Sequence, residues 1–396
     1  MIHSFPTDRK KMRETLLDAV EAVREVLVAG AAESEEIGTL PEASVDALEQ
    51  AGLLAMKLPA EFGGAEADPV TQLQVIEAVT RIDPSAGWVM MIGAATIASP
   101  AVFLSDEAIE QMFIGGRPPR TAGALMPSGQ AMPVDGGYVV NGRWSFGSGI
   151  KHSQWISAGA LVTSSEGEIL ERLSVVFPTA EAMIHDNWQV GGLKGTGSND
   201  FSVSGLFVPE MFTWRRGSDQ KPRRGGPLYR IGLPGFLAVE HAAFALGVGH
   251  RALEAIIDLA QNKKRGYSTY SNPALLADRS SFQLALGRHD LRLRAARSLA
   301  TAIFEGVWET VCRGGPPTTN EQADMRACGA FATEVAADVA TNAFRYGGGT
   351  ALYSSHILQR CLSDINAAAQ HFMVNDTAYE SHGQLLLGLP DANPMS

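Results

Sequence analysis

The chain has 396 residues, of which 45% are hydrophobic and 19% are charged, a composition typical of a globular protein. Its formal net charge of −11 disfavours binding to the phosphate backbone of a nucleic acid. The three cysteines are widely spaced, with no CxxC pair and no histidine at zinc-ligand spacing, so we expect neither a disulfide framework nor a metal site.

The N-terminal stretch and the longest apolar stretch indicate a soluble protein of the cytoplasm. "MIHSFPTDRKK" has neither the apolar core nor the cleavage site of a signal peptide. The apolar stretch from Val89 to Leu104 is interrupted by glycine, threonine, serine and proline, so we expect that it does not span a membrane. In such a reducing compartment the thiols would be free and mostly buried.

Residues 1–118 are predicted to form an N-terminal helical domain, because apolar residues recur at helical spacing between charged ones. Pro41 suits the first turn of one helix, which should end near Gly52. Another helix should begin around Pro69. Ser105 is expected to be the N-cap of the last helix in this part.

Residues 119–214 are predicted to form a small antiparallel β-sheet or barrel domain. Here β-branched and aromatic residues alternate with polar ones, and glycines separate the runs. "YVV", an "NG" dipeptide and "RWSF" together predict a β-hairpin with its turn at Asn141 and Gly142. "WISAGALV", "RLSVVFP" and "FSVSGLFVP" predict further strands.

Residues 215–396 are predicted to form a C-terminal four-helix bundle, because four long stretches are apolar at helical spacing. The last two of these stretches are 320–346 and 355–379. The fold class expected for the whole chain is therefore mainly α with a central β domain. This order of domains does not by itself assign a function.

Two loops of small and polar residues are the first candidates for a binding site. "WSFGSG" runs from Trp144 to Gly149, and "LKGTGSND" runs from Leu193 to Asp200. Such loops let a flat or anionic ligand approach the backbone closely, but the same composition also builds plain turns. The sequence contains no GxGxxG, Walker or GxSxG motif, so it carries no nicotinamide fingerprint.

The stretch "DINAAAQHF" places His371 at the end of a row of alanines in a predicted helix. Ala367 and Ala368 would then precede the histidine by four and three residues and leave a hollow the size of a ring. The alternative is that the alanines admit a neighbouring helix and that His371 is a packed core residue. Spacing alone leaves both interpretations open.

Several motifs together resemble the acyl-CoA dehydrogenase fold, and more narrowly its flavin-dependent monooxygenase branch. These are "GW" at Gly87–Trp88, "GGYVVNGRWSFGSG", "GLKGTGSND" and "LQRCLSDINAAAQH", in an order that matches the predicted domains. The similarity extends from Ser34 to Gly388. It implies the oxygenase component of a two-component system, assembled as a homotetramer through its C-terminal bundle.

The resemblance also implies roles for individual residues. Ser148 would place its hydroxyl against flavin N5, His371 would be the active-site base, and Lys264 and Arg265 would hold the phosphate-bearing part of the flavin. Further cofactor-binding residues would be Trp144, Phe146, Gly149, Thr196, Gly197, Ser198 and Gly348. The substrate would contact Trp88, Thr96, Gly147, Ala367, Ala368 and His371.

Three departures from related enzymes narrow the expected substrate. No glutamate occupies the position of the acyl-CoA dehydrogenase base. Phenol hydroxylases of the branch carry a histidine where this chain has Thr96, and a serine where it has Gly147. Because both absent groups hold a phenolic oxygen in the branch, we expect indole or an indole-like heteroaromatic as the substrate.

The reaction implied by the resemblance uses reduced flavin, as FADH2 or FMNH2, together with O2. A separate NAD(P)H-dependent flavin reductase would supply the flavin. A C4a-hydroperoxyflavin would then hydroxylate or epoxidise the aromatic ring, provided that the site keeps it dry. The alternatives are a phenol or polycyclic aromatic hydroxylase, an amino-sugar N-oxygenase, an acyl-CoA dehydrogenase and a non-catalytic flavin-binding protein.

Overall fold

The computed structural model describes residues 3–164, 168–217, 221–263 and 275–395, and it divides the chain into two compact units. Unit one comprises Met1–Ala67, Trp88–Val190 and Lys194–Tyr229. Unit two comprises Asp68–Gly87, Gly191–Leu193 and Arg230–Ser396.

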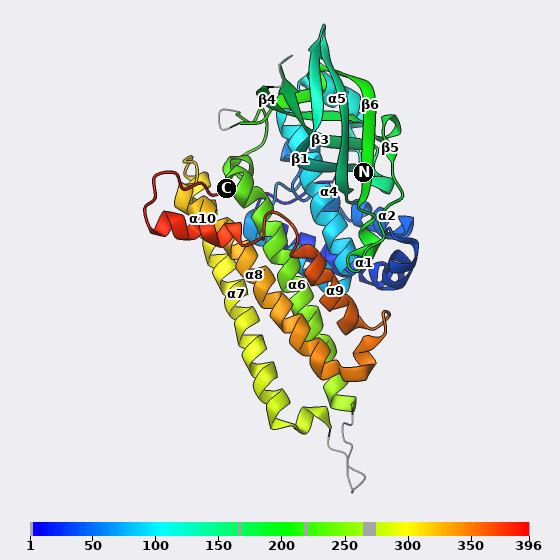
Figure 1. Ribbon diagram of the computed structural model, residues 1–396, viewed down its shortest axis with the longest axis vertical. Coiled ribbons are helices and arrows are strands. Elements are labelled where there is room, and N and C mark those ends of the chain that lie inside the picture. The colour runs from blue at the N-terminus through cyan, green and yellow to red at the C-terminus, as the bar shows by residue number, and fades with distance from the viewer. Residues whose placement is uncertain (1–2, 165–167, 218–220, 264–274, 396) are drawn as a thin grey trace. The chain divides into compact units, whose positions relative to one another are not determined.

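Unit one combines N-terminal helices with one β-sheet (Figure 1). Ser105 caps the last of these helices as predicted, because its hydroxyl accepts a hydrogen bond of 3.2 Å from the Ala108 N–H. The predicted ending near Gly52 is also close to the observed helix end at Gln50. The helices are α1 (Arg9–Ile37), α2 (Glu42–Gln50), most of α4 (Pro84–Phe103) and α5 (Asp106–Met112).

In the part of the chain that the structure describes, the sheet has seven strands in the order β5-β6-β2-β1-β3-β4-β7. Its central position between helical segments confirms the predicted fold class. One detail differs from the antiparallel prediction, because β1 and β3 pair in parallel with Thr121 opposite Trp155. The strands are β1 (Thr121–Val134), β2 (Gly137–Gly147), β3 (Trp155–Thr163), β4 (Ile169–Pro178), β5 (Met183–Ile184), β6 (Asn199–Pro209) and β7 (Thr213–Arg215).

The predicted hairpin at Asn141 and Gly142 is wrong, because β2 runs through both residues as one strand. The turn lies instead before β2, where Gly136 has a φ of 77° that suits glycine. At Gly142 the register against β6 shifts, and the Asn141 side chain accepts a hydrogen bond of 2.7 Å from the Gly205 N–H. A bulge therefore uses the dipeptide that the sequence pattern assigned to a turn.

The core of unit one lies between the sheet and helices α4 and α5. Trp144 is fully buried there, stacked on Phe201 with ring centroids 5.2 Å apart. Its indole N–H donates to the Gly159 carbonyl at 2.7 Å. Ile97 and Leu104 of α4 belong to the same buried cluster. This packing fixes β2, the strand that leads into the "WSFGSG" loop, against α4.

Among the described residues, two helices are long and apolar enough to cross a membrane by length and composition, namely Pro84–Phe103 and Gly232–Asn262. The first includes the stretch from Val89, and its helix continues through the glycine, threonine, serine and proline within that stretch. Within the protein, however, 72% of its apolar window and 78% of that of the second helix are buried. Both therefore have the burial expected of core helices in a globular protein.

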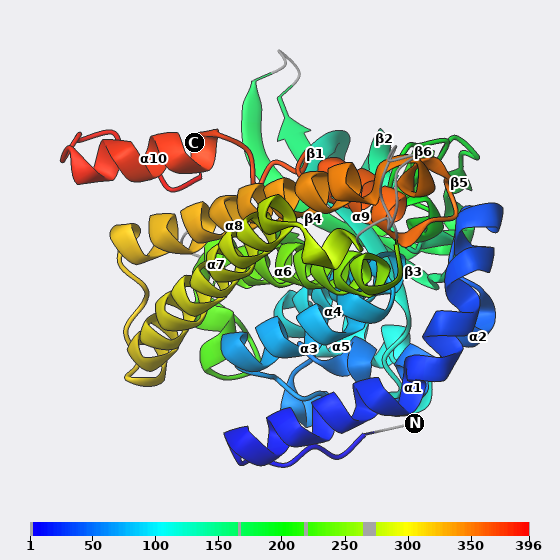
Figure 2. The same cartoon turned by 90° about the horizontal axis from the view of Figure 1, so that it is seen from below.

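Unit two is a helical bundle in which α8 packs along both α6 and α7 (Figure 2). The stretch predicted as one helix from 355 to 379 is wrong, because it breaks into two helices with a turn between them. The helices are α3 (Pro69–Ile82), α6 (Gly232–Asn262), α7 (Ser280–Cys312), α8 (Thr319–Gly347), α9 (Ile357–Ala368) and α10 (Thr377–Leu386).

Candidate active site

A buried cluster of hydroxyl groups surrounds Ser148 in unit one. The Trp88 indole N–H donates to Ser148 Oγ at 3.1 Å, and Ser148 Oγ lies 2.8 Å from Ser198 Oγ. Ser198 Oγ in turn lies 2.6 Å from Thr196 Oγ1. The backbone joins the same two loops, because the Gly149 N–H donates to the Thr196 carbonyl at 2.9 Å. The structure therefore brings together the "WSFGSG" and "LKGTGSND" loops.

Phe146, which precedes Ser148 by two residues, forms an exposed aromatic surface with Trp188. Phe146 is 69% exposed although it is large and apolar, and its φ of 69° lies in the left-handed region. Trp188 meets it edge to face, with ring centroids 6.1 Å apart. A strained backbone that exposes an aromatic ring is typical of a ligand site rather than of a plain turn. The surface suits a flat ring system held next to a hydroxyl group.

Three glycines of these loops allow close backbone packing. A Cβ at Gly147 would lie 3.0 Å from the Asn199 carbonyl oxygen, so the serine of related enzymes would crowd this strand pair. Gly149 and Gly197 have φ values of 68° and 54°, which favour glycine. A Cβ at Gly197 would lie 2.8 Å from the Thr39 hydroxyl. The loop shape therefore depends on all three positions.

His371 lies in unit two but not on a helix, which corrects the geometry expected for it. Helix α9 ends at Ala368, and the His371 N–H donates to the Ala368 carbonyl at 3.1 Å. The predicted hollow over Ala367 and Ala368 therefore does not follow from helical spacing. Alanine-rich sequence predicted continued helix, but the chain turns here, and the residues after the turn form α10.

The local contacts of His371 define its protonation. Its Nδ1 atom accepts a hydrogen bond of 3.3 Å from the Met373 N–H, so the neutral ring carries its proton on Nε2. Burial lowers the pKa of His371 to about 4. The ring also packs against that of His241 of α6 in a tilted arrangement, with centroids 4.1 Å apart. At neutral pH the side chain is therefore an uncharged imidazole.

Arg326 of α8 holds the turn that carries His371. Its Nη2 donates to the Phe372 carbonyl at 3.1 Å and to the Thr377 hydroxyl at 2.6 Å. Its Nη1 donates to the Pro394 carbonyl at 3.0 Å. One buried guanidinium thus bridges the residue after His371, the start of α10 and the C-terminal segment. No local sequence pattern singles out Arg326, because its partners lie far from it along the chain.

Two acidic residues anchor α9 within unit two. The Asp364 carboxylate accepts a hydrogen bond of 2.7 Å from the N–H of Leu193, whose φ is 54°. Asp83 lies 3.6 Å from Arg360, and burial raises the pKa of Asp83 to about 6. Both contacts join α9 to residues outside the helix.

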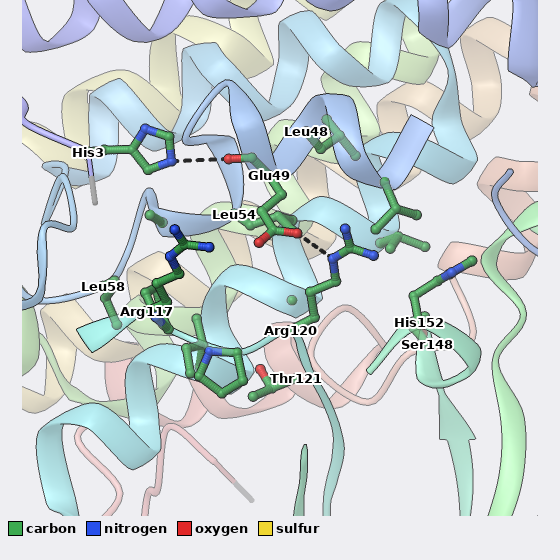
Figure 3. Close-up of a pocket in the computed structure, with 18 residues that line it drawn as sticks. His3, Leu48, Glu49, Leu54, Leu58, Arg117, Arg120, Thr121, Ser148 and His152 are labelled. Atoms are coloured by element: carbon green, nitrogen blue, oxygen red, sulfur yellow. Dashed lines mark hydrogen bonds and ion pairs between the residues drawn. The ribbon is translucent and has the colours of Figure 1, made fainter. Parts of the chain in front are cut away.

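A pocket in unit one lies next to Ser148 and was not predicted from the sequence (Figure 3). It encloses about 780 Å³ of space, part of it open to solvent, between α2, α4 and the segment before β1. Val89 and Ile97 of α4 contribute apolar side chains to its wall. On one side, Arg120 is bound by the carboxylate of Glu49, whose carbonyl contacts His3.

The remaining predicted site residues have other surroundings. The Thr96 hydroxyl lies 2.9 Å from that of Thr121 and contacts the carbonyls of its own helix, so it ties α4 to β1. Trp144 is a core residue of the sheet. Gly348 follows α8 with a φ of 55°, and the neighbouring Gly347 carbonyl accepts from Lys263. The predictions for Lys264 and Arg265 lie outside the described residues.

Comparison with known proteins matches both ends of the chain to one family. Residues 8–115 match the acyl-CoA dehydrogenase N-terminal domain, and residues 239–376 match the acyl-CoA dehydrogenase C-terminal domain. An indole-3-acetate monooxygenase of Pseudomonas putida is 32% identical over 87% of this chain and 86% of its own length.

Two solved structures show a similar fold over almost the full length. One is the 3-HSA hydroxylase from Rhodococcus sp. RHA1, with a TM-score of 0.87, 25% identity and coverage of 96% of this chain and 98% of the other. The other is XiaF from Streptomyces sp. in complex with FADH2 and glycerol, with a TM-score of 0.88, 25% identity and 98% coverage of both chains.

Proposed function

The chain belongs to the flavin-dependent monooxygenases of the acyl-CoA dehydrogenase family, and on this premise we propose that it is the oxygenase component of a two-component aromatic hydroxylase. It is an oxidoreductase that uses reduced flavin and O2.

Its proposed substrate is indole or an indole-like heteroaromatic. A separate NAD(P)H-dependent reductase would supply the reduced flavin, and the proposed assembly is a cytoplasmic homotetramer. We also keep 1–118, 119–214 and 215–396 as the proposed domains.

The observation that carries this proposal is the Ser148 cluster beside an exposed aromatic surface. Phe146 and Trp188 offer apolar ring faces and edges, and Ser148 offers a hydroxyl. These residues fit a flavin, a flat ring system whose nitrogen N5 would be able to form a hydrogen bond with a hydroxyl. Gly149, Gly197 and Ser198 would let the ring approach the two loops closely. Lys264 and Arg265 keep their proposed role at the phosphate-bearing part of the flavin, and Gly348 stays a proposed cofactor-binding residue.

The chain's own residues would perform three tasks in the reaction. Bound reduced flavin would supply two electrons, and O2 would supply the oxygen atom that enters the aromatic ring, with its second atom leaving as water. Ser148 would hold the flavin edge through a hydrogen bond, in a cluster that is itself almost fully buried. The apolar wall formed by Val89 and Ile97 would accept the substrate ring and exclude water.

His371 would contribute a neutral imidazole. Because its Nδ1 accepts the Met373 N–H and its pKa is lowered to about 4, we propose that it acts first as an Nε2–H hydrogen-bond donor. It would donate to an oxygen atom of the reacting groups rather than remove a proton at the outset. This revises the base that the resemblance implies, because a ring that resists protonation is a weak base near neutral pH.

A product screen tests the proposed function. The purified protein would be combined with a generic flavin reductase, NADH and O2, together with indole, phenols, polycyclic aromatics or an amino sugar. We expect oxygenated product from indole-type substrates and little from phenols. Oxidation of all the flavin with full release of hydrogen peroxide, for every substrate, would refute the hydroxylase. Flavin reduction by an acyl-CoA thioester would instead identify an acyl-CoA dehydrogenase.

A further inference from the structure

The two contacts of the Ser148 hydroxyl, with Trp88 and with Ser198, set how many hydrogen bonds it can offer to a ligand. A hydroxyl has one hydrogen to donate and two lone pairs that accept. The Trp88 indole N–H can only donate, so it occupies one of the two lone pairs of Ser148. One hydrogen and one lone pair of Ser148 then remain for all its other partners.

Ser198 uses either the remaining hydrogen or the remaining lone pair of Ser148, because either serine can be the donor in the bond between them. If Ser148 donates to Ser198, Ser148 keeps one lone pair and can only accept a hydrogen bond from a ligand. If Ser198 donates to Ser148, both lone pairs are filled and Ser148 can only donate. In each case Ser148 offers a ligand one bond of one kind. Thr196, at 2.6 Å from Ser198, can adjust to either direction.

A hydroxyl that can either donate or accept one hydrogen bond suits a ligand atom that changes from acceptor to donor during a reaction. Flavin N5 accepts a hydrogen bond in the oxidised ring and carries a hydrogen in the reduced ring. We propose that Trp88 is a positioning residue that restricts Ser148 to one bond toward N5, and that Ser198 and Thr196 reverse its direction when the flavin changes state. The inference rests on the proposed function, because it requires flavin N5 beside Ser148.

The burial of the cluster supports this role. Trp88, Ser148, Ser198 and Thr196 are 7%, 5%, 2% and 0% exposed, so solvent does not compete for their hydrogen bonds. In such surroundings each hydrogen bond is stronger, and an unsatisfied group is more costly than in water. The inference also revises Trp88, which the resemblance placed at the substrate. Its indole N–H faces Ser148.

The test compares Trp88→Phe with the wild-type protein. Phenylalanine keeps an aromatic ring but removes the N–H, so Ser148 regains a lone pair and its orientation becomes ambiguous. Reduced flavin bound to each protein is mixed rapidly with O2 without substrate, and the decay of the transient flavin absorbance is recorded. We expect the lifetime of this transient to be about 2- to 10-fold shorter in Trp88→Phe, because that factor corresponds to the free energy of one hydrogen bond. The dissociation constant of Trp88→Phe for oxidised flavin should differ from the wild-type value by less than about threefold. A weak net hydrogen bond is worth about 0.5 kcal/mol, which corresponds to a factor of about two in a dissociation constant.

A second variant and a matched control complete the experiment. Ser198→Ala should also speed the decay, and the double variant should decay no faster than the faster single variant, because both residues act through Ser148. Trp214→Phe removes another buried indole, stacked on Phe103, and should keep the wild-type decay. A wild-type decay rate in Trp88→Phe would overturn the inference alone. A wild-type protein without any transient would overturn the proposed function and the inference with it.

Discussion

The ring of His371 lies 4.1 Å from the ring of His241, centroid to centroid, at an interplanar angle of 31°. Two imidazoles this close cannot both be charged without strong repulsion, and burial already lowers the pKa of His371 to about 4. The contact places the side chain between α6 and the turn after α9. A histidine that the sequence assigned to a helix face is thus supported by another histidine 130 positions away, counting from 241 to 371.

We expect His371→Ala to retain flavin binding and to lower the product formed per flavin oxidised by about tenfold, the effect of losing one hydrogen bond to the reacting groups. Wild-type coupling should show no titration of His371 between about pH 5.5 and 8.5, because its pKa lies below that range. His289→Ala is the control, since burial also lowers the pKa of that histidine on α7. Unchanged coupling in His371→Ala would remove the imidazole from the mechanism.

Arg360→Met should destabilise the protein more at pH 8 than at pH 5. The pKa of Asp83 is raised to about 6, so the folded state binds a proton that the unfolded state releases, and stability falls as pH rises through this range. Above pH 6 the charged Asp83 depends on Arg360, and losing it should lower the free energy of unfolding by up to about 3–5 kcal/mol.

Near pH 5 Asp83 is protonated, and the loss should be much smaller. Urea unfolding at both pH values measures the difference. Arg292→Met is the control, because Arg292 pairs with Asp338 in a half-exposed ion pair. Equal losses at the two pH values would contradict the raised pKa of Asp83.

Arg326→Lys should loosen the turn that carries His371, because an ammonium group cannot reach all the acceptors of the guanidinium fork. We expect faster hydrogen exchange at the Met373 amide, which bonds to His371 Nδ1, together with lower coupling. Exchange measured by mass spectrometry would localise the effect to the turn. Arg294→Lys, on an exposed face of α7, should leave both readouts unchanged. Wild-type protection of Met373 would argue against the role of Arg326.

Arg120→Ala should destabilise unit one, because Arg120 binds the carboxylates of Glu42, Asp46 and Glu49 on one face of α2. The three acids are partly exposed, so we expect a loss of about 1–2 kcal/mol, less at high salt. Arg143→Ala is the control, because this arginine is more exposed than Arg120 and pairs with a single acid, Asp200, so its loss should cost about 0–1 kcal/mol. Thermal unfolding at low and high salt measures both. Equal, salt-independent losses would contradict the network.

Local sequence signals predicted the parts of the fold that depend on neighbouring residues. Ser105 caps its helix through a hydrogen bond to a residue three positions away. Asp68 caps the helix that begins at Pro69 in the same way. Alternating apolar residues predicted the strands now seen as β3, β4 and β6. These features need only the chain's own periodicity and capping chemistry, so they can be recognised without knowing the fold.

Signals that depend on distant partners were misleading. "NG" favours a turn by itself, yet β6 pairs with β2 on both sides of it and keeps the strand continuous. The alanines before His371 favour helix, yet Arg326 binds the chain just beyond them and the helix ends at Ala368. In both cases tertiary hydrogen bonds outweighed a local propensity of a few tenths of a kcal/mol per residue, which is about the usual scale of such preferences.

The sequence by itself determined the fold class and, through resemblance, the family and most candidate residues. Periodicity and motif order depend only on the order of residues along the chain, so they can be recognised without the structure. Only the tertiary structure decided what these residues contact. Trp88 and Ser148 are separated by 60 positions, yet they share a hydrogen bond. The tautomer and lowered pKa of His371 arise from its burial in the turn and from the Met373 N–H. Hydrogen-bond direction and desolvation depend on three-dimensional neighbours, and no linear spacing specifies them.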